Sequence, residues 1–360
     1  MKGFDLKLYA VGPCLAMAML AGCGGSQPAT GGPSVLPQSP TTPMQRNRGA
    51  QPLTQLNLYV ANENASTVTV YEPGTSSPLQ TISAGVSGPE GLTFDTSENL
   101  YVANYGNNTV TVYSNGSTSI LRTISKKVKK PDAVVFNTSD DRVYVADSGT
   151  SPYGAVTAYS DSGKYLKTIT AGVNYPFALA VDTSGNLYVA NVGTIPFSVT
   201  VYSPTKNTLL RTITAGLSFP SALAFDSAGN LYVANEEGNT VTVYAPGSTT
   251  LSRTISQGVD FPEALAFGPS GYLNVANADA GSSGTVTQYA PGSGTVARTI
   301  TDGIDSPASL AFGSNGYLNV GNVGGNSGYG SITEYPPGSG TVARTITDGI
   351  NFPYAIAFGP

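Results

Sequence analysis

Residues 228–235 read Ala-Gly-Asn-Leu-Tyr-Val-Ala-Asn, and close variants of this octapeptide return along the chain. The valine of the motif recurs seven times, at intervals of 42 to 45 residues: Val60, Val102, Val145, Val189, Val233, Val275 and Val320. A proline followed by an apolar run also recurs seven times: Pro89, Pro131, Pro176, Pro220, Pro262, Pro307 and Pro353. Self-similarity at such a period is typical of repeat architectures. The chain is therefore expected to contain seven copies of one structural unit.

One unit, residues 220–256, contains four candidate strands at residues 222–225, 231–234, 240–244 and 253–255. The first two are almost entirely apolar, whereas the last two alternate with Thr, Ser and Arg. In a β-propeller the inner strands are enclosed by neighbouring blades and the outer strands meet water. This gradient predicts an all-β fold, a seven-bladed β-propeller with four antiparallel strands per blade.

The ends of the repeat region predict how the ring closes. The region opens with a strand of the second type at residues 56–61 and ends with a strand of the first type at residues 354–358. We therefore expect the C-terminal strand to complete the first blade. The predicted propeller spans residues 56–360.

These repeats resemble the NHL repeat family over about residues 56–360, most clearly at residues 228–235. The resemblance implies a propeller, but this fold serves several functions. Similar propellers include binding scaffolds, lyases and, more distantly, gluconolactonase-like metal hydrolases. Propellers like virginiamycin B lyase use a histidine in their mechanism, and this chain contains no histidine. That activity is therefore not expected here.

The N-terminus has the features of an export signal. Lys2 and Lys7 precede a short apolar stretch that ends in Leu20-Ala21-Gly22-Cys23. This ending resembles the lipobox of bacterial lipoproteins, and the resemblance implies that residues 1–23 are a signal peptide and that Cys23 receives the lipid. The alternative is an ordinary secretory signal with a chance cysteine. With the lipid, the protein would be anchored to a membrane outside the cytoplasm, in the periplasm or on the outer surface.

Residues 24–55 are rich in Pro, Gly, Ser, Thr and Gln. Such a composition buries too little apolar surface to fold. We expect a disordered tether with a reach of about 30 Å as a flexible coil.

Composition excludes several classes of function. The formal net charge of −5 argues against a nucleic-acid partner, because nucleic-acid binders carry a basic face. The absence of histidine excludes a Ser-His-Asp triad, a histidine base and a histidine-ligated metal. The two cysteines, Cys14 and Cys23, both precede the predicted propeller. We therefore expect no disulfide in the propeller, and we expect a monomer.

The residues after the seven prolines are expected to surround the mouth of a central channel. Among them, Glu90, Asp132 and Glu263 are acidic. They are candidate ligands for Ca²⁺ or Mg²⁺, which favour oxygen donors. The alternative is that they are solvated loop acids. An Asn follows each second strand (Asn62, Asn104, Asn191, Asn235, Asn277 and Asn322, with Asp147 in blade three). Because this residue repeats in every blade, we expect it to satisfy backbone groups in the turns.

Two further groups are candidates for ligand contact on the same face. Four aromatic residues precede prolines: Tyr175, Phe219, Phe261 and Phe352. They either close the loops against the core or form an aromatic recess for a ligand. Lys126, Lys127, Lys129 and Lys130 form the one dense basic run. This run is either a solvated loop or a contact for an anion, such as a surface glycan or phosphate.

The sequence favours a non-enzymatic scaffold that offers one face to a protein or glycan partner at the cell envelope. The alternative is a metal-dependent hydrolase or lyase acting through Glu90, Asp132 and Glu263. The two hypotheses differ in one structural expectation, since a metal enzyme requires these acids to meet around a single ion.

Overall fold

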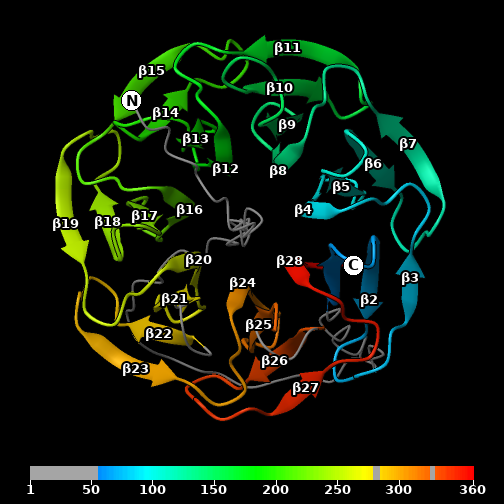
Figure 1. The fold of residues 1–360 in the computed structure, drawn as a ribbon, viewed down its shortest axis with the longest axis vertical. Helices are drawn as coiled ribbons and strands as arrows, with labels where there is room; N and C mark the ends of the chain where they lie inside the picture. Colours follow the sequence, from blue (N-terminus) through cyan, green and yellow to red (C-terminus); the bar gives the residue numbers. More distant parts are fainter. Residues whose placement is uncertain (1–55, 279–283, 325–328) are drawn as a thin grey trace, which may run out of the picture.

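The computed structural model describes residues 56–278, 284–324 and 329–360. These residues form 28 β-strands in seven four-stranded antiparallel sheets. Figure 1 shows the sheets arranged as blades around a central axis. The predicted seven-bladed propeller, with four strands in each blade, is confirmed.

The strands of each blade are given from the axis outward. Blade one contains β28 (Pro353–Gly359), β1 (Asn57–Asn62), β2 (Thr67–Tyr71) and β3 (Gln80–Ile82). Blade two contains β4 (Pro89–Phe94), β5 (Leu100–Asn104), β6 (Thr109–Tyr113) and β7 (Ile120–Ile124). Blade three contains β8 (Pro131–Asn137), β9 (Arg142–Asp147), β10 (Ala155–Ser160) and β11 (Tyr165–Ile169). Blade four contains β12 (Pro176–Val181), β13 (Leu187–Asn191), β14 (Ser198–Tyr202) and β15 (Leu209–Ile213).

The last three blades follow the same order. Blade five contains β16 (Pro220–Phe225), β17 (Leu231–Asn235), β18 (Thr240–Tyr244) and β19 (Leu251–Ile255). Blade six contains β20 (Pro262–Phe267), β21 (Leu273–Asn277), β22 (Thr285–Tyr289) and β23 (Val296–Ile300). Blade seven contains β24 (Pro307–Phe312), β25 (Leu318–Asn322), β26 (Ser331–Tyr335) and β27 (Arg344–Ile346).

Local sequence determines the turn between the first and second strands. In blade five, Asp226 Oδ1 accepts hydrogen bonds from the N–H groups of Ala228 and Asn230. Gly229 lies between them at a φ of 80°, a conformation that glycine adopts without steric cost. The Asp-x-x-Gly-Asn sequence therefore reverses the chain within five residues. It brings the apolar strands β16 and β17 into register.

The core lies between the blades. Every residue of β17 is buried, whereas β19 alternates between half-buried and exposed positions and only its last residue is buried. This contrast confirms the predicted decline in burial from the inner to the outer strands. Neighbouring blades pack through aromatic pairs, such as the edge-to-face contact of Tyr232 with Phe267, whose ring centroids lie 5.0 Å apart.

The ring closes through the first and last strands, as predicted. β28 pairs antiparallel with β1, and Ile356 lies opposite Val60. The Tyr71 hydroxyl of blade one also donates a 2.6 Å hydrogen bond to the Asp348 carbonyl, in the loop that precedes β28. The strands differ by one residue at their ends from the predicted ranges 56–61 and 354–358.

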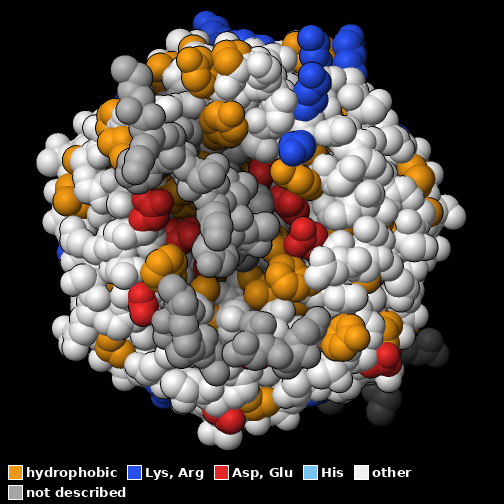
Figure 2. Space-filling view, in the orientation of Figure 1, with side chains coloured by type: hydrophobic (Ala, Val, Ile, Leu, Met, Phe, Trp, Pro, Cys, Tyr) orange, Lys and Arg blue, Asp and Glu red, His pale blue; other side chains and the backbone are white. Residues whose placement is uncertain are grey.

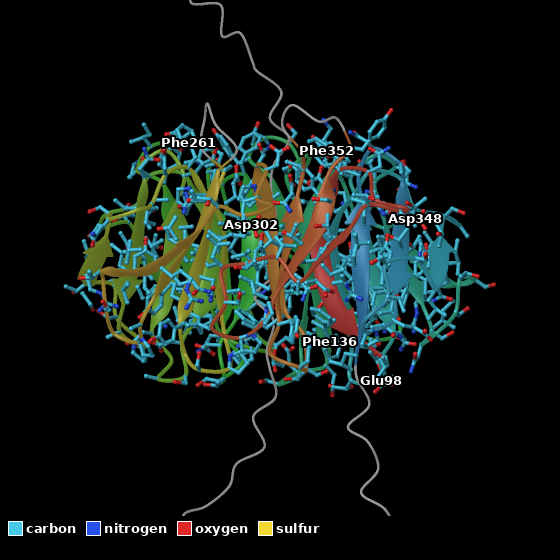
Figure 3. The ribbon with its side chains drawn as sticks, turned by 90° about the horizontal axis from the view of Figure 1, so that it is seen from below. Glu98, Phe136, Phe261, Asp302, Asp348 and Phe352 are labelled. Carbon is cyan, nitrogen blue, oxygen red and sulfur yellow. The ribbon has the colours of Figure 1, made fainter. Side chains whose placement is uncertain are left out.

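The propeller has two faces, which Figure 3 separates. We call the face that carries Phe261 and Phe352 the upper face, and the face that carries Glu98 and Phe136 the lower face. β1 begins at the lower face, because its first residue, Asn57, pairs with Gly359 at the far end of β28 from Phe352. The first described residues of the chain therefore lie at the lower face.

Candidate binding site at the bulge ring

A β-bulge at the upper end of each inner strand changes the direction of one side chain. In blade two, Pro89 pairs with Asn104 and Gly91 pairs with Ala103, so Glu90 has no residue opposite it. The same shift follows the proline in every blade. Bulges redirect side chains and are common next to functional sites. We call the seven bulged residues the bulge ring: Tyr354, Glu90, Asp132, Phe177, Ser221, Glu263 and Ala308.

A repeated hydrogen-bond network holds each bulge in place. In blade five, Asn235 Oδ1 accepts from the Ser218 N–H at 3.1 Å, and Asn235 Nδ2 donates to Thr242 Oγ1 at 3.0 Å. The Phe219 carbonyl, just before the proline, accepts from the Glu236 N–H at 3.0 Å. In blades one, two, four, six and seven, the equivalent Asn residues are buried and accept the equivalent N–H groups. The predicted structural role of these Asn residues is confirmed.

The three acids of the bulge ring are buried. Glu90, Asp132 and Glu263 are only 2%, 3% and 5% exposed, and they lie in strands rather than in loops. The expectation of solvated loop acids is therefore wrong. The proline begins the strand instead of preceding it, and the bulge turns the next side chain inward between blades.

Burial changes the ionisation of two of these acids. It raises the pKa of Glu90 to about 10, with further increases from the negative charges of Asp132 and Glu63 and a decrease from Lys130. Burial also raises the pKa of Asp132 to about 7, opposed by hydrogen bonds from Ser148. Glu90 Oε2 has no hydrogen-bond partner in the described part of the chain. At neutral pH, Glu90 is therefore a protonated carboxylic acid that is able to donate a hydrogen bond.

The three acids do not meet around a single metal ion, as the metal-enzyme hypothesis requires. Glu90 and Asp132 lie on adjacent blades and interact electrostatically, but Glu263 lies on blade six, which neighbours neither of their blades. Among the residues that the structure describes, no group of three or more Asp, Glu, Cys or His residues is placed to hold a metal ion. The structure thus pairs two of the three candidate ligands for Ca²⁺ or Mg²⁺.

The four aromatic candidates have different surroundings. Phe219 packs edge-to-face against Phe177 and Phe197, with centroids 5.7 and 6.0 Å apart. Phe352 stacks on Tyr354 at 5.8 Å. Tyr175 is 44% exposed, and Phe261 donates its backbone N–H to Asn239 Oδ1. Within the described ranges, no aromatic ring contact joins these groups.

Sequence reasoning missed a second set of residues on this face. Glu63, Tyr105 and Glu236 directly follow the structural Asn of their blades. Glu63 contributes to the raised pKa of Glu90, and burial together with Glu237 raises the pKa of Glu236 to about 7. Their position one residue after each Asn was the available signal. Figure 2 shows acidic side chains gathered around the centre of the upper face.

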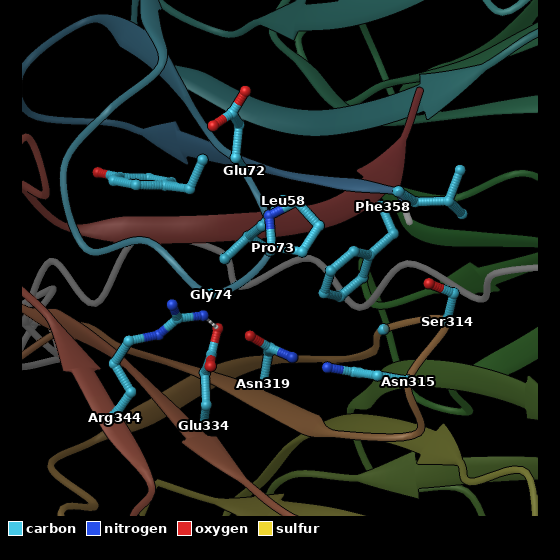
Figure 4. Close-up of a pocket in the computed structure, with 13 residues that line it drawn as sticks. Leu58, Glu72, Pro73, Gly74, Ser314, Asn315, Asn319, Glu334, Arg344 and Phe358 are labelled. Atoms are coloured by element: carbon cyan, nitrogen blue, oxygen red, sulfur yellow. Dashed lines mark hydrogen bonds and ion pairs between the residues drawn. The ribbon is translucent and has the colours of Figure 1, made fainter. Parts of the chain in front are cut away.

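A separate small cavity lies between blades seven and one, near the lower face (Figure 4). Its volume is about 20 Å³, and its lining includes Asn319, Glu334, Arg344 and Phe358. Arg344 and Glu334 form an ion pair at 2.5 Å. Asn319 Oδ1 has no partner in the described ranges. A polar cavity of this size holds about one water molecule, so it is too small to bind a metabolite.

The remaining candidate residue lies outside the described part of the chain. Cys23 belongs to residues 1–55, which also include the predicted signal peptide and tether. Within the described ranges, the protein contains no helix with the length and apolar character needed to cross a bilayer.

Comparisons with known proteins identify the fold and no family. No family model and no curated protein matches the chain. A crystal structure of a functionally unknown protein from Desulfotomaculum acetoxidans DSM 771 is similar, with a TM-score of 0.67 and 16% sequence identity. The match covers 84% of this chain and 98% of the other. At this identity the likeness supports the shared propeller fold alone.

Proposed function

We propose that this protein is a lipoprotein with NHL-like repeats, a non-enzymatic scaffold that binds a protein or glycan partner at the cell envelope. In this proposal, Cys23 carries the lipid and residues 24–55 form the tether. The upper face around the bulge ring contacts the partner.

The observation that carries the proposal is a local break in the sevenfold repeat. The proline before each bulge and the polar residue that anchors the loop are almost the same in all blades. The bulged residue itself is acidic in three blades, aromatic in two, and Ser or Ala in the others. A position with a purely structural role has no reason to vary in this way. Variation at a bulged position on the upper face suits recognition of an asymmetric partner.

The chemistry of the ring suits binding to polar groups. Glu90 Oε2 is buried without a hydrogen-bond partner in the described ranges, and an unmade hydrogen bond of this kind costs about 1–3 kcal/mol. A partner that accepts a hydrogen bond from Glu90 would recover this energy. The aromatic pair Phe352 and Tyr354 lies on the neighbouring blade and would supply apolar contact area.

The direction of the chain supports use of the upper face. β1 begins at the lower face, so a membrane anchor on the segment before it would favour an arrangement with the lower face toward the bilayer. The upper face would then be open to other components of the envelope.

Site-specific photo-crosslinking in cells tests this proposal. A benzophenone amino acid replaces Phe352 on the upper face or, as the control, Glu98 on the lower face (Figure 3). The two positions have nearly equal backbone angles, with φ of 61° and 63°. We expect a discrete adduct from position 352, weakened by Glu90→Gln/Asp132→Asn, and none from position 98. Equal labelling from both faces, or adducts only from position 98, would rule out the bulge ring as the binding site.

A further inference from the structure

Four lysines form an exposed track on the upper face. Lys126, Lys127, Lys129 and Lys130 lie in the loop between β7, the outermost strand of blade two, and β8, the innermost strand of blade three. All four are exposed, whereas Val128 between them is buried and fixes the loop to the core. None of them forms an ion pair with an Asp or Glu in the described ranges. Figure 2 shows these cations as a local blue cluster on a face that is otherwise poor in basic residues.

Tyrosines accompany the lysines along this track. Lys126 Nζ lies 5.1 Å from the ring centroid of Tyr165, on the outermost strand of blade three. Lys130 Nζ lies 5.2 Å from the ring centroid of Tyr105, which follows β5 near the axis. The two contacts show that the lysine loop runs from the rim of the propeller toward its centre. Such an extended arrangement suits a linear polymer better than a single ion.

Backbone hydrogen bonds join this loop to two more exposed tyrosines. The N–H groups of Ser148 and Gly149 donate to the carbonyls of Lys130 and Lys129, both at 3.1 Å. The loop that begins at Ser148 contains Tyr153, whose carbonyl accepts from the Tyr175 N–H at 2.5 Å. Tyr153 and Tyr175 are 56% and 44% exposed. We call the four lysines with Tyr105, Tyr153, Tyr165 and Tyr175 the Lys-Tyr surface.

We infer that the Lys-Tyr surface binds an anionic glycan, a sugar polymer that carries carboxylate or phosphate groups. The unpaired lysines attract the acidic groups. Tyrosine rings offer apolar faces to the C–H groups of sugars and hydroxyls to their polar edges. A bilayer is less suited to this surface, because β1 begins at the opposite face. The Lys-Tyr surface adjoins the bulge ring at Lys130, which acts electrostatically on Glu90 and Asp132. The variants below leave Glu90 and Asp132 unchanged, so the failure of this inference is distinguishable from that of the proposed function.

Binding measurements with labelled polymers and the full-length protein test the inference. The probes are polygalacturonate and a polyglycerol phosphate substituted with sugars, compared with neutral dextran, polyglutamate and phosphatidylglycerol vesicles. We expect binding of at least one anionic sugar polymer, weakened by added salt, and no binding of dextran. The preferred polymer identifies the acidic group. Equal or tighter binding of polyglutamate would overturn the inference in favour of an acidic protein, and preference for the vesicles would overturn it in favour of a lipid surface.

Two sets of variants separate specific binding from general charge. Lys127→Gln/Lys129→Gln should weaken binding about tenfold. The control, Lys164→Gln/Lys206→Gln, makes the same change in net charge and should change the affinity less than twofold. These two lysines lie on the turns between the third and fourth strands of blades three and four. Tyr153→Ser/Tyr175→Asn should weaken binding of the sugar polymer but not that of polyglutamate; Asn is chosen because Tyr175 has a φ of 50°. Equal losses in both lysine pairs, or no loss in the tyrosine variant, would overturn the assignment.

Discussion

At the scale of single residues, one blade departs from the Asn that anchors the loops. In blade three this position is Asp147, which is fully buried. Thr157 Oγ1 donates to Asp147 Oδ2 at 2.6 Å, and the Lys129 N–H donates to Oδ1 at 3.1 Å. Burial raises the pKa of Asp147 to about 8. The other six blades avoid this ionisation because an amide makes the equivalent hydrogen bonds without a charge.

Asp147→Asn should therefore stabilise the protein at pH 8. The substitution removes the cost of keeping a carboxyl group neutral in the folded state, and Asn Nδ2 can donate to Thr157. We expect a gain of about 1 kcal/mol, or an increase of roughly 3 °C in Tm. The reciprocal change, Asn104→Asp, should lower Tm, and more at pH 8 than at pH 5. A lower Tm for Asp147→Asn would show that the carboxylate makes an interaction that an amide cannot replace.

Glu90 should make stability depend on pH. Its pKa in the folded state, about 10, lies above the ordinary value of 4.5. The unfolded chain therefore loses the proton first as pH rises, and stability falls from about pH 4.5 upward. Glu90→Gln should increase the free energy of unfolding at pH 8 by on the order of 2 kcal/mol. Thermal melts should show this as a higher Tm at pH 8, with little change at pH 4. Glu72→Gln, at an exposed position, is the control. A uniform shift at both pH values would point to packing rather than ionisation.

At the scale of strands, the second and third strands of blade seven differ from those of blade five. Tyr232 and Val243 of blade five face each other, whereas Asn319 and Glu334 occupy these positions in blade seven. Arg253 donates to the Tyr232 hydroxyl at 3.1 Å, while Arg344 pairs with Glu334. The smaller Asn319 accounts for the cavity beside Phe358 (Figure 4).

Asn319→Tyr/Glu334→Val should restore the pattern of blade five. The tyrosine ring would occupy the cavity and pack against Phe358, as Tyr232 packs against Phe267, and its hydroxyl would accept from Arg344 in place of the carboxylate. Arg344 stays charged in this variant, but its side chain is 19% exposed, and Arg253 of blade five shows that a tyrosine hydroxyl can serve as the acceptor. We expect a higher midpoint in denaturant unfolding, with an unchanged slope. Glu334→Val alone should destabilise, because it leaves Arg344 without a partner. If the double variant is no more stable than this single one, the cavity does not accept the ring.

The repeat predicted the strands better than it predicted the site. Apolar runs and turn residues recur, and each is a local property of the chain, so the blades and their closure could be inferred. The bulge at Glu90 is a property of strand register, and whether that side chain meets water depends on the neighbouring blades. Sequence therefore placed Glu90 beside the axis but in a solvated loop. It also grouped Phe219 with Phe352, although one packs on blade four and the other on Tyr354.

At the scale of the whole molecule, stability depends on the pairing of the two ends of the ring. Truncation after Phe352 removes β28 with the buried residues Tyr354 and Ile356. Each contributes about 1.5–3 kcal/mol by burial, against a total stability of about 5–15 kcal/mol. The loss also exposes the edge of β1. We expect aggregation or a large decrease in Tm, while removal of Pro360 alone should have a small effect. An unchanged melting curve would mean that blade one is stable without its inner strand.

The proposed lipid anchor has a direct chemical test. Cys23→Ser should abolish acylation, because the serine hydroxyl cannot replace the thiol in this transfer, and should release the protein from the membrane fraction. Mass spectrometry of the N-terminal peptide and cell fractionation measure the two effects. Cys14→Ser is the matched control and should remain acylated. A wild-type protein without an acyl group would contradict the lipoprotein assignment.

The position of β1 also determines how the propeller responds to mechanical load. A membrane anchor would pull on β1 from the lower face, along the direction of the strand. β1 is hydrogen-bonded to β28 on one side and to β2 on the other, so this pull shears two ladders at once instead of opening one bond after another. The first blade should therefore resist this force well. The C-terminal strand β28, which would carry no direct load, supplies one of the two ladders that resist it.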